Sequence, residues 1–150
     1  MRNHEVVTAH RLLDEKGALI EPGWSRSLVQ IYDRNDIKKR KTRIKEWDYY
    51  YVMSHSNKIA LCLTISDLSY LGMASVVNLE NATEHTDSII VPFTMGKTNL
   101  PPTSAVGDVK FKNKKLAMEF LNKGDYRVLR VDYPEFDGGK GLRANVKLTD

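Results

Sequence analysis

The sequence predicts an all-β fold, an antiparallel meander that forms a barrel or a strongly curved sheet and is preceded by an N-terminal clasp. Two observations lead to this prediction. From Trp47 onward, short segments rich in Val, Ile, Tyr, Leu and Phe follow one another, separated by turn-forming residues. In addition, no segment carries a long series of apolar residues at helical spacing. The length of 150 residues fits one domain with a single core.

Residues 1–46 are expected to form a clasp that packs on the remaining lobe, residues 47–150. Residues 14–17, Asp-Glu-Lys-Gly, lie between two short apolar runs and predict a hairpin turn. Asp33 or Asn35 is expected to cap a single helical turn. A basic connector then leads to the lobe.

The lobe is expected to contain a series of short strands. The segments between them are rich in Asn, Asp, Gly, Pro and Ser, which favour turns through their backbone angles and side-chain hydrogen bonds. The predicted strands are residues 47–54, 58–66, 70–80, 86–94, 108–112, 115–121, 126–133 and 142–148. Short links between successive strands predict antiparallel pairing.

The strands differ in how many of their faces are apolar. In residues 142–148, Leu and Val alternate with Arg, Asn and Lys, so one face is expected to contact water, and residues 109–112 behave likewise. Residues 59–66 have no strongly polar face, which is typical of a strand covered on both sides. The second cover is expected to be the clasp, a partner subunit or another domain.

Five segments resemble an uncharacterised bacterial family of unknown function. They read LLDEKGALIEPGW, RIKEWDYYYV, ALCLTISDLSYLGMASV, VPFTMGKTNLP and GDVKFKNKKLAMEF, and together they span nearly the whole chain. Members are distantly similar to tandem lipocalin-like proteins of the hydroxyneurosporene synthase and AttH types. The resemblance implies a lipocalin-like lobe, the first of two. It implies no activity for this chain and places no catalytic residue.

Composition and charge narrow the classes of function. Lys and Arg total 23 and Asp and Glu total 19, so the net charge of +4 is too small for a surface devoted to nucleic acid. Cys62 is the only cysteine, which excludes an intramolecular disulfide and zinc binding by cysteines. No apolar stretch has the length of a signal peptide or a membrane span. The expected location is cytoplasmic.

A basic run immediately precedes four aromatic residues. It consists of Lys38, Lys39, Arg40, Lys41, Arg43 and Lys45. Such a cluster is able to contact phosphates, and the alternative is a solvated connector. We favour the connector because stacking of bases requires outward-facing aromatics, whereas these tyrosines are expected to continue into a core strand. Nucleic acid is therefore not an expected partner.

The sequence offers few candidates for chemistry. Glu46 and Asp48 flank Trp47 on one side of a predicted strand, a spacing suited to acid catalysis if both carboxylates face a dry cavity. The alternative is that both face water. The four histidines are scattered, so no metal site and no cofactor are predicted. Cys62 has no neighbouring base and is interpreted as a buried structural thiol.

A set of aromatic, methionine and leucine residues is the candidate binding site for an apolar ligand. Methionine adapts to irregular shapes and suits such a pocket. The set comprises Tyr49, Tyr51, Met53, Leu61, Leu63, Met73 and Met95. The alternative is a filled core, since small barrels usually fill their interior with side chains.

These observations favour a non-catalytic protein that binds a hydrophobic small molecule or lipid. One alternative is a hydratase, isomerase or cyclase that acts on an apolar substrate through Glu46 or Asp48. Another is an interaction module whose two-sided strands form a homodimer or contact a missing second lobe.

Overall fold

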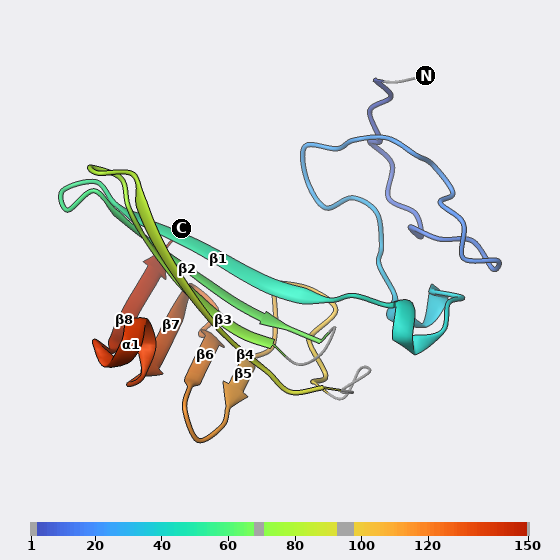
Figure 1. Cartoon of the computed structure of the whole chain (residues 1–150). Coiled ribbons are helices and arrows are strands. Elements are labelled where there is room, and N and C mark those ends of the chain that lie inside the picture. The colour runs from blue at the N-terminus through green and yellow to red at the C-terminus, as the bar shows by residue number, and fades with distance from the viewer. Residues whose placement is uncertain (1–2, 68–70, 93–97, 150) are drawn as a thin grey trace. The chain divides into compact units, whose positions relative to one another are not determined.

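The computed structural model of the chain describes residues 3–67, 71–92 and 98–149 (Figure 1). The chain divides into two compact units, Met1–Arg40 and Lys41–Asp150. All of the described strands belong to the second unit. The predicted boundary between residues 46 and 47 lies close to this division. Packing of the N-terminal segment on the lobe stays a prediction.

The first unit contains the hairpin turn predicted at residues 14–17. The Asp14 amide donates to the Ala18 carbonyl at 2.9 Å, and the Gly17 amide donates to the Asp14 carbonyl at 3.0 Å. The Asp14 carboxylate accepts from two amides inside the turn, Lys16 N at 2.9 Å and Ala18 N at 2.8 Å. Gly17 has a φ of +77°, which glycine adopts without strain. The turn therefore forms for the reason that its composition suggests.

The predicted helical turn is also present in the first unit. It is the 3₁₀ turn η1, Arg34–Asp36, and the Asp33 carboxylate caps it by accepting from the Asn35 amide at 2.9 Å. The Arg11 guanidinium holds the end of this turn through Asp36, at 2.6 Å from Nη2 to Oδ1. A second 3₁₀ turn, η2 at Lys41–Arg43, begins the second unit.

The second unit consists of two antiparallel four-stranded sheets in which consecutive strands are neighbours (Figure 1). The first sheet contains β1 Trp47–Ser54, β2 Ile59–Ser66, β3 Leu71–Asn78 and β4 Thr83–Ile90. The second contains β5 Val109–Lys112, β6 Ala117–Asn122, β7 Tyr126–Tyr133 and β8 Leu142–Thr149. A short helical segment, α1 Phe136–Gly139, joins β7 to β8.

The predicted all-β antiparallel fold is confirmed, and β1 and β7 have the predicted bounds. The fourth strand differs from its prediction, since β4 begins at Thr83, inside a segment expected to be a turn. Within the described residues, no strand of the first sheet is hydrogen-bonded to a strand of the second. The described strands therefore form two sheets and no closed barrel.

The inner faces of the two sheets share one tightly packed core. Leu63 and Ile65 of the first sheet and Phe111 and Phe120 of the second are each at most 1% exposed. Gly72 on β3 has no room for a side chain, because an added Cβ would lie 2.9 Å from the Phe111 ring and from Leu116 Cδ2. Side chains thus fill the space between the sheets at this point.

The one-sided strands have the predicted alternation. Along β8, the residues of one parity are half-buried while Arg143, Asn145 and Lys147 are exposed. On β5, Val109 and Phe111 are buried while the two lysines between and after them are exposed. These alternations fix which face of the second sheet contacts the core.

Candidate functional site

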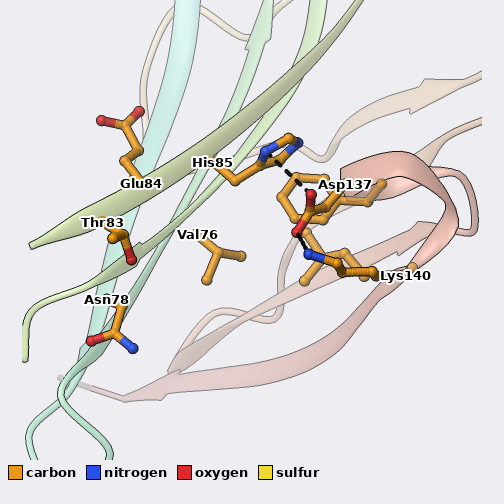
Figure 2. A pocket seen from close by; sticks show the side chains of 10 residues that line it. Val76, Asn78, Thr83, Glu84, His85, Asp137 and Lys140 are labelled. Atoms are coloured by element: carbon orange, nitrogen blue, oxygen red, sulfur yellow. Dashed lines mark hydrogen bonds and ion pairs between the residues drawn. The ribbon is translucent and has the colours of Figure 1, made fainter. Parts of the chain in front are cut away.

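An open pocket of about 530 Å³ lies between the inner face of β3 and β4 and the segment around α1 (Figure 2). We call it the β4–α1 pocket. Its volume is within the range of roughly 300–1,000 Å³ that is usual for small-molecule sites. The lining residues are Val76, Asn78, Thr83, Glu84, His85, Phe136, Asp137, Lys140, Gly141 and Leu142.

The floor of the pocket is apolar because of strand alternation and register. Val76 and His85 are cross-strand partners on β3 and β4, and both face the second sheet. Phe136, 5% exposed, contributes its ring from α1, and half-buried Leu142 contributes from the start of β8. These side chains offer a surface for the hydrocarbon part of a ligand.

The rim of the pocket is a group of charged and titratable side chains. His85 Nε2 lies 3.1 Å from Asp87 Oδ2, and His85 Nδ1 lies 3.5 Å from Asp137 Oδ1. Lys140 Nζ lies 2.8 Å from the other carboxylate oxygen of Asp137, as Figure 2 shows. The His85 ring also meets the Phe136 ring edge-on, with centroids 5.0 Å apart. The imidazole is therefore held between two carboxylates and above the apolar floor.

The position of Asp137 depends on an unusual backbone. Its φ of +50° lies in the left-handed region, which aspartate tolerates better than most residues. The Asp137 amide donates to the Asp87 carboxylate at 2.7 Å, which ties α1 to β4. This amide, followed by the His85 ring, lowers the pKa of Asp87 below its ordinary value. Asp87 therefore stays ionised at neutral pH and orients both groups.

The arrangement suits recognition of polar groups better than metal binding. Among the described residues, no cluster of three or more His, Cys, Asp or Glu side chains has the geometry to hold a metal ion. Both ring nitrogens of His85 already face carboxylates. The pocket can instead offer the Lys140 ammonium, the Asp137 carboxylate and the imidazole to a polar ligand group.

The predicted ligand-binding residues are not brought together in one pocket. In the β1–β2 register, Tyr49, Tyr51 and Met53 share a face with Ala60, Cys62 and Thr64, and Met73 on β3 lies on the same face. Leu61 and Leu63 lie on the opposite face and belong to the core. Met95 lies outside the described residues. The described members of the set thus lie on both faces of the first sheet, and their binding of a ligand stays a prediction.

The predicted carboxylates lie at the start of the first sheet. Glu46 and Asp48 are both half-buried, and the Glu46 carbonyl accepts from the Asp67 amide at 2.9 Å. Burial raises the pKa of Asp48, and the positive charge of Arg127 opposes this effect. Neither carboxylate lines the β4–α1 pocket. The raised pKa of Asp48 thus occurs outside the β4–α1 pocket, and a catalytic role for the two carboxylates stays a prediction.

The pocket residues were missed by reasoning from the sequence. His85 looks isolated in the sequence, because Asp137 and Lys140 are far from it along the chain. Two local signals were available, the His-x-Asp alternation of residues 85–87 and the polar, glycine-rich segment around Asp137. Only the packing of α1 against β4 makes them one site.

Comparison with known proteins identifies a family for the chain. Within the described residues, no helix has the length and apolar character needed to cross a bilayer. No curated protein and no solved structure matches the chain. The model of one family, described as a domain of unknown function (DUF2804), matches residues 3–150. Because this match covers nearly the entire sequence, the chain belongs to the DUF2804 family.

Proposed function

We propose that this protein binds an apolar small molecule or lipid that carries one polar group, and that the β4–α1 pocket is the binding site. The observation that supports the proposal is the pairing of an apolar floor, Val76, Phe136 and Leu142, with the charged rim of His85, Asp137 and Lys140. A hydrocarbon chain gains free energy by leaving water for such a floor, while the rim selects the polar end.

The proposal shifts the binding site from the interior to the end of the sheets. A lipocalin-like protein would hold its ligand between the sheets, but the Phe111 and Leu116 side chains fill that space beside Gly72. A distant lipocalin-like relationship, with this lobe as the first of two, remains part of the proposal. In the proposed arrangement, the ligand would enter the β4–α1 pocket from one end of the sheets.

Binding of anilinonaphthalene sulfonate, followed by its fluorescence, tests the proposal. Decanoate and decanol serve as competitors that share a hydrocarbon chain and differ in the polar group. Val76→Asn places an amide on the pocket floor and is expected to weaken probe binding at least tenfold. Val77→Asn is the matched control, because Val77 is the next residue on β3 and faces the opposite side of the sheet.

The two competitors reveal what the rim recognises. Lys140→Ser removes the ammonium and is expected to weaken decanoate more than decanol, because only decanoate carries a charge that the ammonium attracts. The proposal is wrong if Val76→Asn and Val77→Asn bind the probe equally, or if neither competitor displaces it.

A catalytic function has one observation in its favour. An imidazole beside a carboxylate in an apolar pocket is the arrangement of a general acid or base, so a hydratase or isomerase would use His85 in place of Glu46 or Asp48. Ligand extracted from protein kept in deuterated water would then carry deuterium. The same ligand from His85→Gln would carry none, whereas an unlabelled ligand from the unsubstituted protein would exclude this alternative.

A further inference from the structure

The outer face of the first sheet carries a row of large exposed side chains along β1. Trp47 is 62% exposed, Tyr49 is 50% exposed, Tyr51 is 51% exposed and Met53 is 38% exposed. They alternate with half-buried residues that point to the core, and exposed Lys45 continues the alternation just before the strand. We call Trp47, Tyr49, Tyr51 and Met53 the β1 row.

The β1 row lies outside the core because of the register between β1 and β2. Tyr51 is paired with Cys62 and Met53 with Ala60, both small residues that are at most 7% exposed. The large side chains thus stand over a floor of small ones, and β1 is the edge strand of its sheet (Figure 1). The expectation that these tyrosines enter the core is wrong for Tyr49 and Tyr51. It holds for Tyr50, whose ring centroid lies 4.8 Å from the ring centroid of Phe120.

Positive charge is concentrated immediately before the β1 row. Lys41, Arg43 and Lys45 belong to the same unit and are all exposed. Within the described part of the chain, none of the three is paired with a carboxylate. These cations lead into Trp47, Tyr49 and Tyr51, which are exposed and do not enter the core as expected.

We propose that the β1 row and the three preceding cations dock the protein on a membrane that carries anionic lipids. Trp and Tyr favour the headgroup level of a bilayer, where the ring is apolar and its polar group stays hydrated. Lys and Arg near the surface are attracted by the negative potential of anionic lipids. The combination of exposed aromatic residues with adjacent unpaired cations therefore matches the chemistry of this surface.

Single-stranded nucleic acid is the other anionic partner that aromatic residues can stack against. Its phosphates need cations beside the stacking rings along the whole strand. On this face, the residues across from the row are uncharged on β2 and β3, and Glu84 on β4 is an exposed carboxylate. A phosphate backbone along the row would thus meet neutral or negative groups. The cations gather at one end, which suits a planar anionic surface better.

The fluorescence of Trp47 tests the proposal in the full chain. Trp24→Phe leaves Trp47 as the sole tryptophan. We expect its emission to shift to shorter wavelength when vesicles of phosphatidylcholine with phosphatidylserine are added. Pure phosphatidylcholine vesicles should produce a much smaller shift, and added salt should weaken the association because it screens the attraction.

Removal of the three cations tests whether vesicle binding depends on this surface or only on the net charge of the protein. Lys41→Ser, Arg43→Ser and Lys45→Ser in one variant are expected to weaken binding to the anionic vesicles on the order of a hundredfold. The matched control removes the same charge from exposed lysines of the second sheet and its turns, Lys112→Ser, Lys114→Ser and Lys123→Ser. The control variant should bind as the unsubstituted protein does.

Substitution of the aromatics tests the other half of the surface. Tyr49→Ser with Tyr51→Ser is expected to weaken vesicle binding in both low and high salt, because it removes apolar contact and no charge. If this variant unfolds, Tyr51→Ser alone supplies the comparison. The pocket variant Val76→Asn should still bind vesicles, so failure of the docking surface and failure of the proposed pocket are distinguishable.

Three results would overturn the proposal. The first is equal binding to anionic and neutral vesicles. The second is tighter binding to single-stranded oligonucleotides than to anionic vesicles, with Trp47 fluorescence quenched by the bases. The third is self-association that already buries Trp47 without vesicles, seen by sedimentation as a dimer that Tyr51→Ser dissociates.

Discussion

At the scale of single residues, the absence of a side chain at Gly72 decides how closely the sheets approach. Its position on β3 faces the second sheet, where Phe111 and Leu116 occupy the space that a Cβ would need. The nearest atoms belong to a buried ring and a buried leucine, which have little freedom to move. The residue is therefore a sensitive probe of the core.

Gly72→Ala is expected to lower the free energy of unfolding by about 1–3 kcal/mol, because overpacking displaces neighbouring side chains. Urea denaturation followed by circular dichroism measures the change. Ser88→Ala, an exposed position on the outer face of the same sheet, is the control and should have little effect. An unchanged midpoint for Gly72→Ala would mean that the sheets are farther apart than described.

Asp48 is a carboxyl group at a half-buried position, where burial disfavours its charged form. Its pKa is raised above 3.8 by burial, against the attraction of Arg127. The folded state therefore binds this proton more tightly than the unfolded chain, so the contribution of Asp48 to stability decreases as pH rises through that range.

Asp48→Asn is expected to raise the urea midpoint at about pH 7 and to lose this advantage at about pH 3, because the carboxyl is then protonated in both states. Parallel urea titrations at the two pH values measure the difference. Asp125→Asn, in the exposed turn before β7, serves as the control. A lower midpoint at neutral pH would show that the Arg127 attraction outweighs the burial of Asp48.

At the scale of elements, α1 depends on a contact made outside it. The segment contains left-handed residues at Asp137 and Gly138, so it is not a regular helix and its own hydrogen bonds hold it only weakly. The Asp87 carboxylate accepts from the Asp137 amide and compensates for this. Loss of that acceptor should loosen both α1 and the rim of the β4–α1 pocket.

Asp87→Ala is expected to cost about 1 kcal/mol at neutral pH, the usual contribution of one such hydrogen bond. Because the pKa of Asp87 is lowered, its stabilisation is present above 3.8 and is lost as pH falls through the folded-state pKa. The difference from the unsubstituted protein should therefore shrink in acid. Urea titrations at neutral and acidic pH measure it. Asp87→Asn keeps a hydrogen-bond acceptor and should therefore lose less free energy of unfolding than Asp87→Ala. Equal losses in the two variants would show that only the charge of Asp87 matters.

The sequence predicts where the strands lie far better than it predicts which face of each strand contacts the core. β1 and β7 have the expected bounds because both are rich in aromatic and aliphatic residues and end at turn-forming segments. On β2, by contrast, residues of both parities are compatible with burial, so the pattern does not determine which set faces the core. On β1, the run of three tyrosines likewise leaves the choice of face open, and the structure places Tyr49 and Tyr51 on the exposed face. The β4–α1 pocket is not predictable from local sequence, because Asp87 and Asp137 are 50 residues apart along the chain and meet only in the tertiary fold.

At the scale of the whole molecule, the division into two units makes the connector between them the segment that we expect proteases to cut first. The units meet in sequence at Arg40 and Lys41, within a run of exposed basic residues. All of the described strands and the core they enclose belong to the second unit. Exposed connectors with few internal contacts are the preferred sites of proteolysis.

Brief treatment with trypsin is expected to cut first within residues 38–45 and to release a fragment that contains the second unit. Mass spectrometry identifies the cut, and circular dichroism with thermal unfolding shows whether the fragment keeps its sheets and a cooperative transition. First cuts at Arg130 or Arg143, inside strands, would contradict the division. A fragment that unfolds on release would show that the second unit needs the first.

The position of Cys62 has a practical consequence. It is the only sulfhydryl in the sequence, and it is 7% exposed on β2, paired with Tyr51 and lying between Ala60 and Thr64 on its face of the strand. Alkylation by iodoacetamide should accordingly be slow in the intact fold and should proceed only when β1 separates from β2. The rate of alkylation of Cys62 therefore reports how often β1 separates from β2, without any introduced label.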